Sequence, residues 1–120
     1  MTLKDCYQSF GGNYDEVLGR LQREKTVEKF VLKFLDDKSF CLLADAMDEK
    51  QYEDALRAVH TIKGICQNLS FTRLYESSAL MTKTLRDGDV ESAAGMMAQV
   101  TQDYEQTIQC IKDYQQAKGE

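Results

Sequence analysis

Apolar residues recur every three or four positions along almost the whole chain, and no segment between turn residues alternates apolar and polar positions. Such spacing places apolar side chains on one side of a helix and predicts an all-α fold. Proline is absent from the sequence, so the residue that most often breaks helices is missing.

Glycines and capping residues near the N-terminus divide the pattern into two short helices. The first is expected over about residues 2–9, because Gly11 and Gly12 just beyond it suit a turn. Asn13 belongs to the residue types that cap a helix N-terminus, and it predicts a second short helix over residues 14–21.

Four longer amphipathic helices are expected after these two. The first is predicted from Thr26, as its N-cap, to about residue 47, with an interruption at residues 36–39 that favours a kink or break. The others are predicted over residues 52–69, from about residue 71 to residue 85, and from residue 90 onward. The Gln-rich end, residues 115–120, is expected to fray.

The loops between the long helices are short, so neighbouring helices must run in opposite directions. The apolar stripe of the first long helix consists of Val27, Phe30, Val31, Phe34, Cys41, Leu42 and Ala46, and that of the last consists of Val90, Ala93, Ala94, Met97, Thr101, Tyr104, Ile108 and Ile111. The sequence therefore predicts one all-α domain over residues 1–120, an antiparallel up-and-down four-helix bundle with one or two short N-terminal helices.

Composition and charge narrow the classes of partner. No stretch approaches the roughly 18 uninterrupted apolar residues of a membrane span, and residues 1–20 lack the basic start and apolar run of a secretory signal. The net charge of -5 disfavours nucleic acid and anionic lipid, which bind clustered Lys and Arg. We therefore expect a cytoplasmic protein with protein partners, and a monomer, because no long heptad seam remains outside the bundle core.

The four cysteines, Cys6, Cys41, Cys66 and Cys110, are far apart and form no CxxC pair. Together with the single histidine they do not make a usual zinc constellation, so no metal site is expected. We interpret all four as buried thiols in a reducing compartment.

The single histidine, His60, falls on the polar side of the helix predicted over residues 52–69. At about 100° per residue, the apolar residues of this helix lie within about 60° of Ile62 and His60 lies roughly 160° away. The apolar set is Ala55, Ala58, Val59, Ile62, Cys66 and Leu69, whereas the neighbours of His60 are Glu53, Arg57, Gly64 and Gln67. An exposed histidine in this position is either idle or chemically active.

Gly64 and Lys63 favour chemical activity. Glycine inside a helix costs about 1 kcal/mol relative to alanine, and Gly64 points away from the apolar stripe, so a tight helix crossing does not explain it. The missing side chain opens space beside His60, one turn earlier, for a bulky partner. Lys63 brings an ammonium group to the same turn, where it would attract a phosphoryl group on the imidazole.

The stretch His60–Gly64, HTIKG, resembles the HxxKG signature of histidine phosphotransfer (HPt) domains. Two further stretches resemble that family in the same order along the chain. FGGN at residues 10–13 resembles its entry sequence, and LRDGD at residues 85–89 resembles the turn after the helix that follows the histidine helix. The chain departs from the family at Ser70, where many members have glycine, and at Lys38, which interrupts the first long helix.

The resemblance implies a phosphoryl carrier of a two-component phosphorelay. His60 would be the phosphoacceptor, Lys63 the nearby cation, and Gly64 the residue that gives the receiver access. His60 would accept a phosphoryl group from a receiver-domain aspartate and pass it to another receiver. The partners implied are response-regulator receiver domains, with a hybrid histidine kinase as a further candidate.

The same interpretation predicts a carrier without an ATP site or cofactor of its own. The sequence holds no GxxxxGK[ST] loop, and Mg²⁺ is expected on the receiver partner. Contact with the receiver is expected on the His60 face, through Glu53, Leu56, Arg57, Gln67 and Asn68.

Two alternatives remain open and two others are disfavoured. The phosphotransfer domain of a chemotaxis-type kinase shares the signature and would take its phosphoryl group from that kinase's ATP domain; an unphosphorylated helical adaptor would leave His60 idle. A dimerising histidine-kinase hairpin usually has an acidic residue where this chain has Thr61, and a proline shortly after. A metal-binding bundle uses Glu-x-x-His pairs, whereas Arg57 stands three residues before His60.

Overall fold

The computed structural model describes residues 1–119, which are helical apart from short connections. The helices are α1 (Leu3–Phe10), α2 (Tyr14–Leu21), α3 (Glu24–Lys33), the 3-10 helix η1 (Phe34–Asp36), α4 (Ser39–Asp48), α5 (Tyr52–Leu69), α6 (Thr72–Arg86) and α7 (Val90–Gly119). No strand occurs within residues 1–119, so the predicted all-α class is confirmed.

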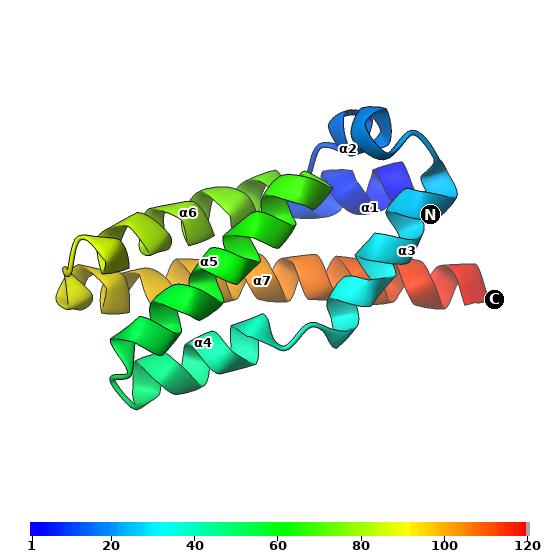
Figure 1. The fold of residues 1–120 in the computed structure, drawn as a ribbon. Helices are drawn as coiled ribbons and strands as arrows, with labels where there is room; N and C mark the ends of the chain where they lie inside the picture. The colour runs from blue at the N-terminus through cyan, green and yellow to red at the C-terminus, as the bar shows by residue number, and fades with distance from the viewer. Residues whose placement is uncertain (120) are drawn as a thin grey trace.

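Helices α4, α5, α6 and α7 form an antiparallel four-helix bundle, as predicted, and the short helices α1, α2, α3 and η1 precede it (Figure 1). α5 packs between α4 and α6, and α6 packs against α7, which runs the length of the molecule. α1 packs on α7 at the end where both termini lie, whereas the turn from α6 to α7 lies at the opposite end (Figure 1).

The first long helix begins earlier than predicted. Gln22 follows α2 in a left-handed conformation with φ of 70°, and the extended Arg23 is the N-cap of α3, which begins at Glu24. Thr26 lies in the first turn of α3 and does not cap it, so this prediction is wrong. By contrast, Asn13 caps α2 as predicted, because its side-chain oxygen accepts a hydrogen bond of 3.0 Å from the Glu16 amide.

The interruption predicted at residues 36–39 is a full break. η1 ends α3, and Asp37 takes an extended conformation with ψ of 136°. Its carboxylate accepts a hydrogen bond of 2.8 Å from the Ser39 amide at the start of α4. The prediction of a single helix to residue 47 is therefore wrong, whereas the predicted break around Lys38 is confirmed.

The break changes which residues of this segment face the core. Phe34 and Leu43 are buried, with 3% and 0% of their surface exposed. Cys41 is exposed, and so is Leu42, at 61%. A continuous helix would place both in its apolar stripe; this prediction is wrong for them, and for the partly exposed Phe30 as well.

The cysteines follow the prediction in part. Cys6 and Cys66 are buried, Cys110 is half-buried, and the exposed Cys41 contradicts the prediction. Removal from water disfavours the charged thiolate, so burial raises the pKa of the Cys6 thiol to about 12.

α7 is buried on a wider arc than its apolar stripe predicts, because both α6 and α1 pack against it. Asp103 and Thr107 are buried, whereas the predicted core residue Ala94 is exposed. Gln99 Nε2 donates to Asp103 Oδ1 at 3.0 Å, and Thr107 Oγ1 donates to the Asp103 carbonyl at 2.8 Å. These bonds satisfy the buried polar groups within the helix.

The C-terminal end of α7 also differs from the prediction. The helix continues to Gly119, so the predicted fraying is wrong for residues 115–119, and Glu120 lies outside the described residues. Two contacts with α3 hold this end: Tyr114 Oη donates to Glu28 Oε2 at 2.7 Å, and Lys118 forms an ion pair with the same carboxylate.

An aromatic cluster joins the N-terminal helices to the bundle near the end of α5. The Phe71 ring lies 5.7 Å from Tyr7, 5.0 Å from Phe10 and 5.3 Å from Phe34, measured between ring centroids. Such pairs contribute about 0.5–1.5 kcal/mol each beyond the area that they bury. The chain turns beneath this cluster at Gly12, where a Cβ would come within 2.7 Å of the Phe10 and Tyr7 rings.

Candidate functional site

The site is organised by the two sides of α5. Val59, Ile62 and Cys66 face the core and are 0–1% exposed. His60 and Gly64 are both exposed, as expected for positions about 160° from Ile62 around the helix. The structure thus places the histidine on a solvent-facing surface of a helix whose other side anchors it in the bundle.

The polar groups beside His60 are bound to one another. Thr61 Oγ1 donates a hydrogen bond of 3.0 Å to the Arg57 carbonyl, and the Arg57 guanidinium forms an ion pair with the Asp54 carboxylate. The positive charge nearest His60 on the preceding turn is therefore balanced by Asp54. Lys63, half-buried on the following turn, takes no part in this pairing.

Gly64 adjoins open space. A Cβ at this position would meet no atom within 4 Å, apart from its own helix backbone and chain neighbours. Packing inside the chain therefore does not require glycine here. That the missing side chain gives a partner access to His60, one turn away, stays a prediction.

The residues predicted to contact a receiver all lie on α5 along this surface. Glu53, Arg57, Gln67 and Asn68 are exposed, and Leu56 is half-buried. They flank His60 on both sides along the helix axis, so one partner surface can reach them together with the histidine. Their contact with a receiver stays a prediction.

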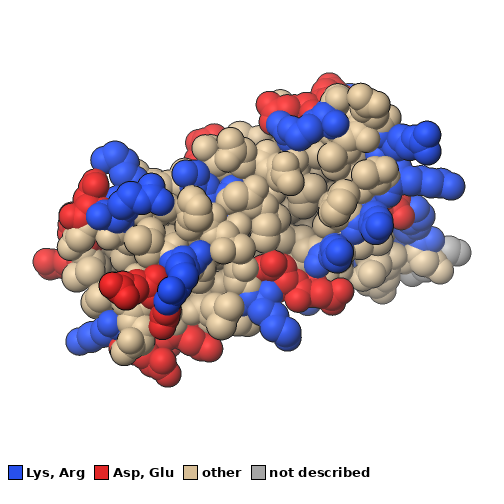
Figure 2. Space-filling view, in the orientation of Figure 1, with Lys and Arg blue, Asp and Glu red and all other residues tan. Residues whose placement is uncertain are grey.

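The sequence did not reveal an apolar hollow beside the C-terminal half of α5. It has a volume of about 260 Å³ and is lined by Leu21, Phe30, Lys33, Phe34, Asp37, Ile65, Asn68 and Leu69. These residues come from α2, α3, η1 and α5 and the turn after η1, so no local spacing could have indicated the hollow. Figure 2 shows the face over α5, where uncharged side chains cover much of the middle.

A second groove lies between α4 and α5, at the N-terminal half of the histidine helix. Its volume is about 530 Å³, and Asp45, Glu49 and Asp54 line it together with a single cation, Arg57. The exposed Leu42 also belongs to its lining. The groove therefore carries a negative charge that the apolar hollow lacks.

Neither a metal centre nor a membrane span emerges from the described part of the chain. Within residues 1–119, no three His, Cys, Asp or Glu side chains gather in a way that could hold a metal ion. No helix in this range combines the length and hydropathy that crossing a bilayer requires.

Comparison with known protein families identifies the region that carries the site. The family model described as Hpt domain matches residues 37–110, which contain α4, α5, α6 and most of α7. His60, Lys63 and Gly64 all lie inside this range. No curated protein and no solved structure matches the chain. Because the matched region covers more than half of the chain, the protein belongs to the Hpt domain family of histidine phosphotransfer modules.

Proposed function

We propose that the protein carries a phosphoryl group in a two-component phosphorelay, with His60 as the phosphoacceptor. Family membership supports histidine phosphotransfer in general. The observation that carries the assignment to this residue is the exposure of the only histidine of the chain, directly beside the open space at Gly64.

In the proposed reaction, the unprotonated ring nitrogen of His60 attacks the phosphorus atom of an aspartyl phosphate on a receiver domain. An N–P bond forms as the O–P bond of the acyl phosphate breaks, and the electron pair returns to the receiver carboxylate. The reverse sequence delivers the group to the aspartate of a second receiver. The receiver supplies Mg²⁺, which stabilises the charge on the transferring group.

Two neighbours of His60 support the transfer in this proposal. Lys63, one turn further along α5, is the cation near the phosphoryl group. Gly64 leaves room for the receiver to approach the imidazole, which favours in-line attack. The chain itself acts as a positioned nucleophile and carrier, without an ATP site or cofactor of its own.

The proposed partners are response-regulator receiver domains, with a hybrid histidine kinase as a further candidate. The carrier acts as a monomer in the cytoplasm. Docking uses the exposed face of α5 with Glu53, Leu56, Arg57, Gln67 and Asn68. The apolar hollow next to Asn68 extends this face and offers Ile65 and Phe30 to an apolar side chain of the receiver. Such an encounter is small and transient.

Transfer from a phosphorylated receiver tests the proposal. The purified chain is mixed with a receiver carrying labelled phosphate and Mg²⁺, and label is followed on both proteins. We expect label on the unaltered chain and none on His60→Gln, whereas Thr61→Ala, a neighbour bound within α5, should accept it normally. Label on His60→Gln would overturn the assignment. Label only from the ATP domain of a chemotaxis-type kinase would replace the proposed donor.

A further inference from the structure

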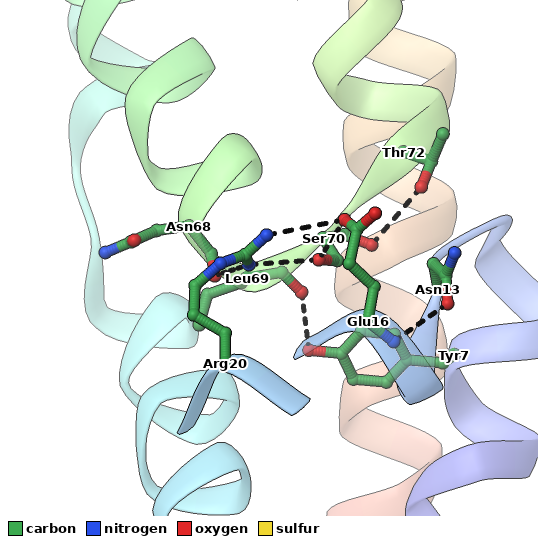
Figure 3. Close-up of polar contacts among 8 residues, drawn as sticks. All are labelled: Tyr7, Asn13, Glu16, Arg20, Asn68, Leu69, Ser70 and Thr72. Atoms are coloured by element: carbon green, nitrogen blue, oxygen red, sulfur yellow. Dashed lines mark hydrogen bonds and ion pairs between the residues drawn. The ribbon is translucent and has the colours of Figure 1, made fainter. Parts of the chain in front are cut away.

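The N-terminal helices, which lie outside the family match, cap the C-terminal end of the histidine helix. The last carbonyl groups of a helix have no partner within it. Here Arg20 Nη1 donates to the Asn68 carbonyl at 2.6 Å, and Tyr7 Oη donates to the Leu69 carbonyl at 2.8 Å. The Asn13 amide donates to the Ser70 carbonyl at 2.9 Å. Three successive carbonyls are thus bound by α1, by α2 and by the turn between them. Figure 3 draws the bonds to the Asn68 and Leu69 carbonyls.

Ser70 joins this cap to α2 through its side chain. It is 3% exposed and has a left-handed backbone with φ of 56°, a conformation that favours glycine. Its hydroxyl donates to Glu16 Oε1 at 2.6 Å and accepts from Arg20 Nη1 at 3.1 Å, and Arg20 Nη2 lies 3.5 Å from Glu16 Oε1. We name Glu16, Arg20 and Ser70 the clasp (Figure 3). A glycine at position 70 would relieve the backbone but could not make these bonds.

The clasp adds to the apolar packing that holds α2. Val17 is the only fully buried side chain of α2. Tyr14, Leu18 and Leu21 are partly buried and also pack against the core. Apolar packing is not directional, whereas the hydrogen bonds of the clasp are. The clasp therefore helps to set the position of α2 against the end of α5.

The position of α2 in turn shapes two hollows on either side of the end of α5. Leu21 forms part of the apolar hollow that also contains Asn68. Glu16 and Arg20 line a third hollow of about 350 Å³ that contains Gln67. Gln67 and Asn68 are two of the residues assigned above to receiver contact, so α2 adjoins the docking face on both sides.

Charge favours this end of α5 over the other for receiver docking. The charges lining the two hollows next to α2 are balanced. Lys33 accompanies Asp37 in one hollow, and Arg20 accompanies Glu16 in the other. The groove between α4 and α5 carries three carboxylates and one cation. A receiver presents its phosphorylated aspartate among the carboxylates that hold Mg²⁺. Like charges repel such a surface from the acidic groove and not from the α2 end.

We propose that the clasp is a positioning device for docking, in which Arg20 and Ser70 hold α2 as a wall of the surface that receives the phosphorylated receiver. This inference rests on the proposed function. Neither residue touches the phosphoryl group, which stays at His60, two turns away from Asn68 along α5. Loss of the clasp weakens docking and leaves the chemical step unchanged.

Steady-state transfer from a phosphorylated receiver through this chain to a second receiver in excess separates these two effects. For Arg20→Ala we expect KM for the receiver to rise at least about five-fold with kcat within about two-fold of the unaltered chain. Ser70→Gly should raise KM similarly and keep the melting temperature within about 3 °C, because relief of the left-handed backbone offsets the lost hydrogen bonds. Arg23→Ala is the matched control: it removes a nearby exposed cation outside the clasp and should leave both constants unchanged.

The outcomes distinguish the clasp from the carrier function. If the unaltered chain transfers phosphate but Arg20→Ala and Ser70→Gly keep its KM, the clasp is only structural and the inference is overturned. A rise in KM for Arg23→Ala equal to that for Arg20→Ala would also overturn it, since charge alone would then explain the effect. If the unaltered chain accepts no phosphate from any receiver, the proposed function fails and the inference fails with it.

Discussion

His60 and Ile62 stand two residues apart on α5 and face opposite ways: Ile62 is 1% exposed in the core, whereas His60 is exposed to solvent. A helix turn of about 200° between the two positions produces this division. The bundle therefore holds the helix through one residue and presents the other, so stability and chemistry can be altered separately.

This division predicts different outcomes for substitutions at the two positions. His60→Gln should change the free energy of unfolding by no more than about 0.5 kcal/mol, because no packing is lost. Ile62→Ala should cost about 2–5 kcal/mol, because it leaves a cavity in the core. Urea unfolding of both variants checks the prediction. A His60→Gln variant as unstable as Ile62→Ala would contradict the exposed position of the histidine.

Gly64 should lower the stability of the protein and, in return, let a receiver reach His60. Gly64→Ala is expected to stabilise the protein by up to about 1 kcal/mol, because alanine favours the helix and its Cβ meets no neighbour. The same methyl group stands beside His60 and should slow phosphotransfer. Urea unfolding and the initial transfer rate are the two measurements.

Gly95→Ala supplies the control for this prediction. Gly95 is an exposed glycine of α7 that also adjoins open space, so alanine should stabilise the protein there without affecting transfer. If Gly64→Ala gains stability and transfers as fast as the unaltered chain, access is not the reason for glycine at position 64.

The four thiols should react with a thiol reagent at distinct rates. Cys41 is exposed and should react first, followed by the half-buried Cys110. Cys6 and Cys66 should react only as the protein unfolds, because burial raises the pKa of both thiols. Mass spectrometry of samples quenched over time identifies the order, and Cys41→Ser should remove the fastest phase. Rapid labelling of Cys66 would contradict the packing of α5.

The contact between α3 and α7 should depend on pH. The ion pair with Lys118 and the hydrogen bond from Tyr114 lower the pKa of the Glu28 carboxyl. A carboxyl whose pKa is lower in the folded state contributes stability above its unfolded value of about 4.3, and this contribution is lost as pH falls through the folded value. Urea midpoints at pH 7 and below pH 4 should therefore differ less for Glu28→Gln than for the unaltered chain. Equal pH dependence in the two proteins would exclude this contribution.

Much of the bundle could be predicted because local signals and core packing agree. Asn13 marks the start of α2, and the apolar set of α5 indicates both its bounds and the exposed side that holds His60. These features depend on residues within a few turns of one another. Periodicity and capping describe such relationships directly.

The features that were missed depend on residues far apart in the sequence. Arg20 and Ser70 are 50 positions apart, and no spacing indicates that their side chains meet. Asp103 is buried because two other helices cover α7, which its own polar character does not suggest. Cys41 faces outward because the break before α4 changes the helical phase. Periodicity indicates such a break more readily than the new orientation of the helix that follows it.

The proposed function depends on a single phosphoryl group that is carried on His60. The most direct measurement is the intact mass of the chain after incubation with a phosphorylated receiver and Mg²⁺, followed by fragmentation to locate the group and by acid treatment. We expect one added phosphoryl group, located on His60 and released by acid. A phosphoryl group on a serine, threonine or aspartate, or no added mass with several receivers, would contradict it.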